Sequence, residues 1–258
     1  MRRLLKRSIS RLALRGRPGG FRILLYHSID RAVAGDRLAL RIAPGEFARQ
    51  MAWLATSGYR LVPLEAVVSA AAADGAVAVT FDDGYRDQLD HAVPVLRHLG
   101  IPATFFLTTR FLDGWTGRGR YWEAWPHMSW QDAAELARAG FAIGAHSATH
   151  AVLAGLAATR LAEEVRDCKK ALEDRLGTRV SSFSYPHGVC DRPAMRAVEG
   201  AGYDLACAGL FGVNRPPIDR FSLLRTEIDG ADRLADFVRK LRGHYDWLGR
   251  WQRWRRDA

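Results

Sequence analysis

Short apolar runs alternate with amphipathic segments from residue 20 to residue 240. The runs are rich in β-branched and aromatic residues, as buried strands are. We predict strands at residues 21–27, 76–81, 101–108, 141–146, 180–185, 203–208 and 221–228. The segments between them carry apolar residues at helical spacing, and Gly100, Gly140 and Gly177 follow the last turns of three of them. We predict helices at residues 44–57, 87–99, 131–139, 157–176, 193–200 and 231–241.

This alternation predicts an α/β fold with a mostly parallel sheet. A chain of 258 residues suits a single α/β barrel, and an open sheet is the alternative. The composition, 48% hydrophobic and 26% charged, excludes a wholly disordered chain, a collagen and a coiled coil. In such barrels the loops that leave the carboxyl ends of the strands form the active site. Polar residues at those strand ends are therefore the candidates for function.

Positive charge is concentrated at the two ends of the chain. Residues 1–18 carry a charge of +7 and residues 239–258 a charge of +5, which together exceed the net charge of +10, so the remainder is −2. We therefore predict a basic amphipathic extension at 1–18, a barrel at 19–243 and a basic Trp/Arg-rich tail at 244–258. The tails suit an anionic membrane surface, and the alternative is a solvated tail whose tryptophans pack on the barrel. Nucleic acid is not expected, because the body is not basic.

The apolar residues near the start are interrupted by Lys6, Arg7 and Arg11, so no signal peptide is expected, and no apolar stretch is long enough to span a membrane. We expect a cytoplasmic protein, peripheral at the inner face of the membrane. The three cysteines form no C-x-x-C pair, which argues against a disulfide framework or a thiolate zinc site.

Two predicted strands end in groups that suit a metal. Asp82 and Asp83 follow the strand at 76–81, and His146 and His150 follow the strand at 141–146. Adjacent dry carboxylates repel each other, and a divalent cation removes that penalty. Asp83, His146 and His150 would supply three ligands and leave positions open for water and substrate. Asp82 would then accept a proton from the bound water.

Each half of this pattern also has an ordinary interpretation. A lone Asp-Asp pair is usually a turn or a helix cap, and a lone H-x-x-x-H is usually a solvated helix face. Both together, each at a strand end, favour a metal site. The same ligand set can hold Fe(II) for oxygen chemistry, which leaves the second aspartate unexplained.

The motifs TFDDG (80–84), HSATH (146–150) and FSYPHG (183–188), with LLYHSI (24–29) and IPATFFL (101–107), resemble the polysaccharide deacetylase family, also called NodB-homology or carbohydrate esterase family 4. The resemblance spans residues 20–230. It implies a single distorted (β/α)7-type barrel, with the basic extensions outside it, and one divalent metal ion, most often Zn²⁺, with Co²⁺, Ni²⁺ or Fe²⁺ as alternatives. It assigns the general base to Asp82 and the metal ligands to Asp83, His146 and His150.

The chain departs from the family in two places. Ser184 stands where many members have an arginine that orients the base, and Arg225 is a candidate to supply that charge. A late histidine that acts as general acid is missing, and His27 lies where the poly-N-acetylglucosamine deacetylase branch has its acid. We expect the His187 N–H to bind the oxyanion. Tyr185 is predicted to lie beside the oxyanion and substrate.

A tryptophan-rich segment at 111–130 follows a predicted strand and should lie on the active-site side, as a sugar-binding loop with Trp125 as a sugar contact or, alternatively, as a packed insert. The expected function is hydrolysis of the acetamide of an N-acetylated sugar in a polysaccharide or lipid-linked glycan, releasing acetate, as in exopolysaccharide synthesis. The alternative is a catalytically inactive glycan-binding or scaffold protein, which the two departures would favour.

Overall fold

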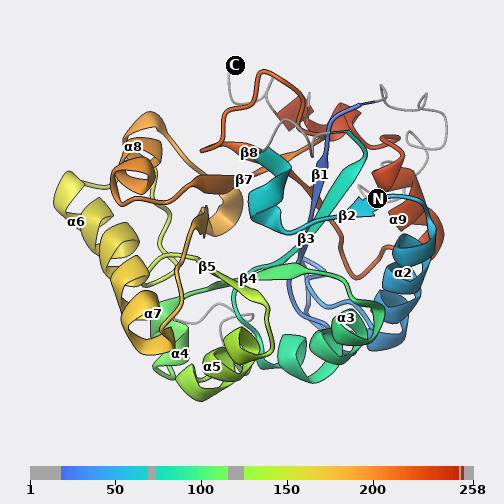
Figure 1. Ribbon diagram of the computed structural model, residues 1–258, viewed down its shortest axis with the longest axis horizontal. Coiled ribbons are helices and arrows are strands. Elements are labelled where there is room, and N and C mark those ends of the chain that lie inside the picture. The colour runs from blue at the N-terminus through green and yellow to red at the C-terminus, as the bar shows by residue number, and fades with distance from the viewer. Residues whose placement is uncertain (1–18, 69–73, 116–124, 250, 253–258) are drawn as a thin grey trace.

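Parallel strands close into a barrel in the computed structural model, which describes residues 19–68, 74–115, 125–249 and 251–252 (Figure 1). β1 (Arg22–Tyr26) pairs with β3 (Ala76–Phe81) on one side and with β8 (Leu223–Glu227) on the other. The order between them is β3, β4 (Ala103–Leu107), β5 (Ala142–Ala145), β6 (Ser182–Ser184), β7 (Leu205–Phe211) and β8. The short β2 (Arg60–Leu61) adds to the start of β3. The predicted barrel is confirmed, and the open sheet was wrong.

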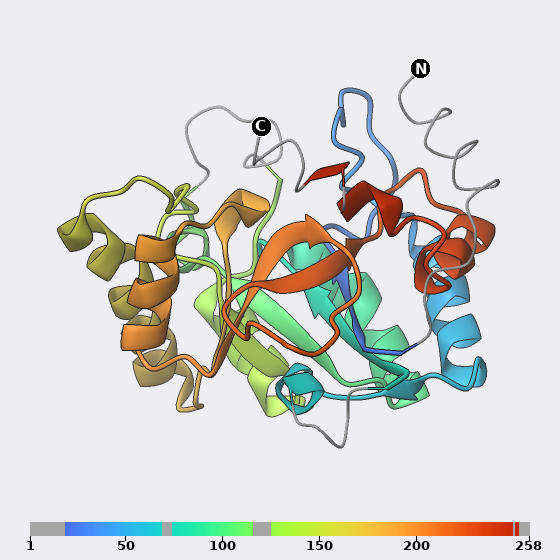
Figure 2. The ribbon, with the colours of Figure 1, turned by 90° about the horizontal axis from the view of Figure 1, so that it is seen from above.

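Helices surround the barrel (Figures 1 and 2). The α-helices are α2 (Pro44–Thr56), α3 (Val93–Leu99), α4 (Thr109–Leu112), α5 (Trp130–Arg138), α6 (Ala158–Ala162), α7 (Cys168–Leu176), α8 (Arg192–Gly200) and α9 (Leu234–Leu241). Two 3₁₀ helices, η1 (Leu64–Val68) and η5 (Pro186–Gly188), lie in connections. The expected helices at 87–99 and 157–176 are not continuous α-helices. They contain the π-helical turns η3 (Gln88–Ala92) and η4 (Glu163–Asp167).

Successive strand residues belong to two separate apolar clusters. On β3, Val77 and Val79 pack with the outer helices, whereas Ala76 and Ala78 belong to the other cluster, inside the barrel. Side chains of a strand alternate between its two faces, so the inward row of β3 continues toward Asp82. The interior therefore changes from apolar to polar toward the carboxyl ends of the strands.

The opposite end of the barrel is filled by apolar side chains. Leu64 and Val67 of η1 pack against Phe106 and the other interior residues there. Gly144 leaves room for this filling, because a Cβ at that position would lie 2.3 Å from a ring carbon of Phe106. The polar end is the one at which a substrate can enter.

The C-terminal segment packs on the barrel as far as the structure describes it. Tyr245 and Leu248 are buried against Phe211, and Asp246 forms a two-pronged ion pair with Arg22 of β1. The boundary expected at residue 243 therefore does not mark the end of the packed structure. The extension at 1–18 and residues 253–258 lie outside the described residues. Within the described part, no helix combines the length and apolar character needed to cross a membrane.

Candidate active site

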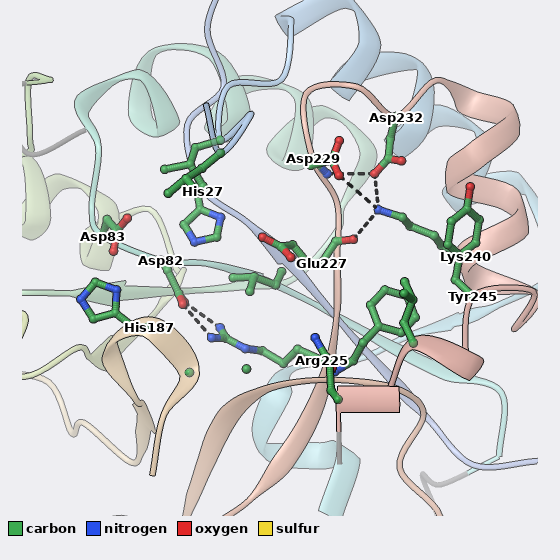
Figure 3. Close-up of a pocket in the computed structure, with 18 of the residues that line it drawn as sticks. His27, Asp82, Asp83, His187, Arg225, Glu227, Asp229, Asp232, Lys240 and Tyr245 are labelled. Carbon is green, nitrogen blue, oxygen red and sulfur yellow. Dashed lines mark hydrogen bonds and ion pairs between the residues drawn. The ribbon is translucent and has the colours of Figure 1, made fainter. Parts of the chain in front are cut away.

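Five strand ends deliver polar side chains to one cavity of about 760 Å³ (Figure 3). The polar residues at this mouth that form the candidate site are His27 after β1, Asp82 and Asp83 after β3, His146 and His150 after β5, His187 after β6 and Arg225 of β8. They come from segments far apart in the chain, and the parallel order of the strands is what places their carboxyl ends at one mouth.

Asp83, His146 and His150 form a group that could hold a metal ion. Asp83 Oδ1 lies 3.2 Å from His146 Nε2 and 3.1 Å from His150 Nε2, and one ligand atom from each residue lies within 4.8 Å of the others. The Nδ1 atom of His146 donates a hydrogen bond of 2.8 Å to the Ser184 carbonyl oxygen. That bond leaves Nε2 as the atom available for coordination. One carboxylate oxygen and two imidazole nitrogens suit Zn²⁺ or a similar divalent ion with open coordination positions.

The backbone at this group is strained. Asp83, Ser147, His150 and His187 have positive φ values of 71°, 63°, 58° and 57°. Non-glycine residues adopt this left-handed region at a cost, so the surrounding structure must hold them there. Gly188 and Gly209 meet so closely that a Cβ on Gly188 would lie 2.1 Å from the Gly209 Cα, and this contact fixes the segment of His187.

The two π-helical turns each supply a buried side chain that holds a site loop. In η4, Glu164 accepts hydrogen bonds from the Thr149 N–H at 2.8 Å and the Thr149 hydroxyl at 2.6 Å. In η3, Gln88 Nε2 donates to the carbonyl oxygens of His27 at 2.9 Å and Asp82 at 2.7 Å. π-helical turns often occur at functional sites, and here they tie the strand ends to the outer helices.

Asp82 lies outside the ligand group and forms an ion pair with Arg225. The guanidinium donates to both carboxylate oxygens at 2.7 Å, and the Ser184 hydroxyl donates to Oδ2 at 3.0 Å. Burial raises the pKa of Asp82, but Arg225 and then His146 outweigh it, so the pKa lies below its ordinary value. Asp82 is therefore ionised at neutral pH. Its nearest approach to the histidines is 3.9 Å, from Oδ2 to His146 Nε2.

The ligand group is also electrostatically matched to a cation. Burial raises the pKa of Asp83, but His150 and His146 lower it to well below its usual range. Burial lowers the pKa of His146, and the carboxylates of Asp82 and Asp83 reverse that effect and raise it. A metal ion would replace the proton on the imidazole, so metal affinity should fall with falling pH.

The other sequence-predicted residues divide into two groups. His27 and His187 line the cavity, and the His187 ring stands edge-on to that of His150 with centroids 4.7 Å apart. The expectations for Tyr185 and Trp125 need correction, because neither lines this cavity.

Tyr185 is buried, and its hydroxyl donates to the Phe221 carbonyl oxygen at 3.1 Å. Neighbouring residues of a strand face opposite ways, so the inward Ser184 sends Tyr185 outward. The Trp125 ring is covered by the Arg41 guanidinium at 4.1 Å and packs on Tyr85 with ring centroids 5.5 Å apart. Residues 116–124 of the same segment lie outside the described residues.

Sequence reasoning missed several residues that build the site. Gln88 and Glu164 lie in segments that read as ordinary amphipathic helices, and nothing in their spacing marks them. Lys240 and Asp232, a buried ion pair at the far side of the cavity, were also missed. A signal existed for Lys240, because it falls on the apolar side of a predicted helix, where a lysine is unusual.

A family model described as Polysaccharide deacetylase matches residues 70–206, more than half of the chain. YxkH of Bacillus subtilis (strain 168) is 31% identical over 194 residues, which is 73% of this chain and 64% of that protein. A chitin deacetylase of Pestalotiopsis sp is 27% identical over 149 residues, 58% of this chain and 46% of that protein. The chain thus spans less than two thirds of the length of each.

Solved structures give the same result for the fold. IcaB from Ammonifex degensii is 26% identical, with a TM-score of 0.73 over 89% of this chain and 99% of that one. The deacetylase PplD of Streptococcus pyogenes is 19% identical, with a TM-score of 0.74 over 87% of this chain and 99% of that one, a likeness of fold. With the matching model, the barrel and the motifs at its strand ends in agreement, the chain belongs to the polysaccharide deacetylase family.

Proposed function

We propose that the protein is a metal-dependent deacetylase that hydrolyses the acetamide of an N-acetylated sugar and releases acetate. The observation that carries the proposal is the division of labour between two adjacent carboxylates. Asp83 lies 3.1–3.2 Å from two imidazole nitrogens, whereas Asp82 is held 2.7 Å from the Arg225 guanidinium. One acid is thus placed to bind a cation and the other to act as a base beside it.

Asp83, His146 and His150 would hold the metal, with Zn²⁺ as the first choice and Co²⁺, Ni²⁺ or Fe²⁺ as alternatives. When bound, such an ion lowers the pKa of a water molecule and polarises the acetyl carbonyl. All three side chains are almost inaccessible to solvent, and this burial strengthens their electrostatic attraction for a cation.

Asp82 acts as the general base, because it is ionised and is buried beside the ligand group without belonging to it. It accepts the proton of the attacking water on a carboxylate oxygen. Arg225 is a positioning residue that fixes the orientation of the Asp82 carboxylate and holds its pKa below the ordinary value. The two-pronged contact supplies from β8 the orientation that Ser184 cannot supply from β6.

His27 serves as the general acid. It lines the same cavity, at the end of β1, and Gln88 fixes its backbone together with that of Asp82. An imidazole has a proton affinity suited to protonating a departing amine near neutral pH. The backbone N–H of His187 holds the oxyanion, a role that is independent of side-chain type.

The substrate is an N-acetylated glycan, in a polysaccharide or linked to a lipid. The basic ends of the sequence, with charges of +7 over residues 1–18 and +5 over residues 239–258, support contact with an anionic membrane surface at its inner face. The other candidate is a catalytically inactive glycan-binding or scaffold protein, which the missing arginine and the missing late histidine would favour. The salt bridge from Arg225 to Asp82 counts against the first of these arguments, and the place of His27 in the cavity counts against the second.

The test is acetate release from N-acetylated oligosaccharides by the purified protein, measured as prepared, after treatment with a chelator and after addition of Zn²⁺. We expect release to stop with the chelator and to return with the metal. Asp83→Asn is the matched control that should lose both bound metal and activity. Glycan binding without acetate release in the metal-loaded protein would instead establish the inactive alternative.

A further inference from the structure

The imidazole of His27 has to be positioned by the backbone that carries it. Figure 3 shows this ring in the cavity, in the same part as Asp82. Within the described ranges the ring forms no hydrogen bond, whereas Nδ1 of His146 is held by the Ser184 carbonyl oxygen at 2.8 Å. A general acid must lie within hydrogen-bond reach of the atom that it protonates. The orientation of the His27 ring therefore depends on how its chain segment, residues 27–29, is held.

Two adjacent side chains bind this segment. The Asp87 carboxylate accepts a hydrogen bond from the Ser28 hydroxyl at 2.6 Å and another from the Ile29 N–H at 2.8 Å. The next residue, Gln88, donates to the His27 carbonyl oxygen at 2.9 Å. All three residues of the segment are thus bound by side chains of the connection that leaves β3. The connection that carries the proposed base therefore also holds the segment of the proposed acid.

The Asp87 side chain does not serve as a helix cap. Asp87 directly precedes the π-helical turn η3, a place where an aspartate ordinarily accepts a hydrogen bond from an N–H of the first turn. Its side chain makes no such bond, and both carboxylate oxygens are bound by residues 28 and 29 instead. The pKa of Asp87 is raised, because burial outweighs the two hydrogen bonds that lower it. A partly buried acid costs stability, so its contribution lies in the segment that it holds.

We propose that Asp87 is a positioning residue for protonation of the leaving group, because it fixes the backbone that carries the His27 imidazole. The proposal rests on the proposed function, in which His27 is the general acid. When an acetamide is hydrolysed, water adds to the acetyl carbon, the C–N bond breaks, and the nitrogen takes the proton of His27 and leaves as an amine. When para-nitrophenyl acetate is hydrolysed, the bond from the acetyl carbon to the phenolic oxygen breaks, and the phenolate leaves with the electron pair and no proton. Asp87 should therefore matter for the first substrate and not for the second.

The kinetic test compares these two substrates in the zinc-loaded protein, with a tetrasaccharide of N-acetylglucosamine as the acetamide. In Asp87→Ala, we expect kcat for acetate release from the tetrasaccharide to fall by about 10²-fold with little change in KM, the typical cost of a small misplacement in an active site. The rate on para-nitrophenyl acetate, with Asp83→Asn as the background, should stay almost unchanged. The ratio of the two rates separates a fault in protonation from a general loss of structure, which would lower both.

Three further variants define what Asp87 contributes. Asp87→Asn should keep most of the activity, because its amide oxygen can accept from the Ile29 N–H and its amide nitrogen can donate to the Ser28 hydroxyl oxygen. Ser28→Ala removes one of the two contacts and should give an intermediate loss, which also carries the test if Asp87→Ala does not fold. Asp90→Asn is the matched control, since this exposed acid lies on the same turn and pairs with Arg86 at 3.1 Å. It should leave both rates unchanged.

Three kinetic results would overturn the proposal. The first is an equal loss on both substrates in folded Asp87→Ala, and the second is an unchanged rate on the tetrasaccharide. The third is a loss in Asp87→Asn as large as that in Asp87→Ala, because the charge of Asp87, and not its contacts, would then be what matters.

A spectroscopic test does not depend on turnover. In protein labelled with ¹⁵N-histidine, the imidazole signals of His27, assigned with His27→Gln, should shift or broaden in Asp87→Ala and Ser28→Ala. They should stay in place in Asp87→Asn and Asp90→Asn. Unmoved signals in Asp87→Ala would mean that Asp87 does not position the ring. Absence of acetate release from every glycan by the wild type would reject the proposed function, while these spectra would still decide whether Asp87 positions His27.

Discussion

Two buried acid–base pairs line the same cavity and behave in opposite ways. Asp82 meets Arg225 with two hydrogen bonds of 2.7 Å, and Asp232 meets Lys240 at 2.5 Å. All four side chains are almost inaccessible to solvent. The pKa of Asp82 lies below its ordinary value, whereas burial raises the pKa of Asp232 to about 6.

The two carboxyl groups differ in pKa because the two cations are shared among different numbers of acceptors. Arg225 points both arms of its guanidinium at one carboxylate, and His146 adds further positive character nearby. Lys240 divides one point charge among Asp232, Asp229 and a backbone carbonyl, and Asp229 opposes ionisation of its neighbour. A planar two-pronged donor thus holds the pKa of a buried acid below its ordinary value, whereas a shared ammonium leaves the pKa of its partner raised. The first arrangement suits a catalytic base, and the second ties α9 to the end of β8.

The largest effect should come from removing the charge of Asp82, the proposed general base. We expect Asp82→Asn to lower kcat by about 10²–10⁴-fold, the range of a general base contribution, while zinc content stays at one ion per chain. Metal analysis and acetate release measure the two quantities separately. Zinc lost from this variant but kept in Asp83→Asn would mean that the two aspartates have exchanged roles.

Breaking the two-pronged contact should have a smaller effect on rate. We expect Arg225→Gln to lower kcat/KM by about 10–100-fold, as for other residues that orient a site. The pKa of Asp82 should rise, since the opposing burial effect remains. Because the base works only when ionised, the acidic limb of the kcat/KM–pH profile should move to higher pH. If the acidic limb of the profile stays in place in Arg225→Gln, the role given to Arg225 is wrong. Arg225→Lys should have a kcat/KM between those of Arg225→Gln and the wild type.

Removing the other cation should affect stability more than catalysis. Lys240→Met leaves Asp232 buried without its partner and should lower the free energy of unfolding by about 3–5 kcal/mol near pH 8. The pKa of Asp232, already raised to about 6, should rise further. Below that pKa the acid is neutral and the penalty disappears, so the loss should be smaller near pH 5. Urea unfolding at both pH values measures it.

The matched control is the exposed pair of Lys170 and Asp174, whose side chains are 74% and 59% accessible. Lys170→Met should leave the free energy of unfolding almost unchanged at either pH, because exposed ion pairs contribute little. A loss in Lys240→Met that is independent of pH would show that packing, and not the charge of Asp232, dominates at that position.

His127 is buried with little to offset the effect of burial on its pKa, and the smallest of the predicted effects concerns this residue. Desolvation lowers the pKa of His127 to about 4, and its ring stacks on Phe111 and Tyr85. The native state resists protonation, so stability is fully present above the ordinary pKa of 6.5 and is lost as pH falls toward 4. The loss is up to about 3 kcal/mol. His127→Phe keeps the stacking, and its urea midpoint should fall less between pH 7 and pH 4.5 than that of the wild type.

Local sequence alone was enough for the order of elements and for the metal group. Strand periodicity placed β3 at residues 76–81, as observed, and the motifs after β3 and β5 named Asp83, His146 and His150, which the fold brings together. The strands are defined by apolar runs of neighbouring residues. Parallel strands in a barrel then place their carboxyl ends at one mouth, so the motifs that follow them come together. The remaining features depend on contacts between residues distant in the chain.

Tertiary structure decided which side chains face that mouth and what surrounds them. Arg225 binds Asp82, which lies 143 positions away in the sequence. The side chains of β6 alternate in direction, so Ser184 points into the barrel and Tyr185 points outward, toward the helices. The π-helical turns and the packing of the C-terminal segment also depend on contacts between residues that are distant in the chain. A side chain's direction and its charge environment depend on register and on distant partners, and local patterns of hydrophobicity contain neither.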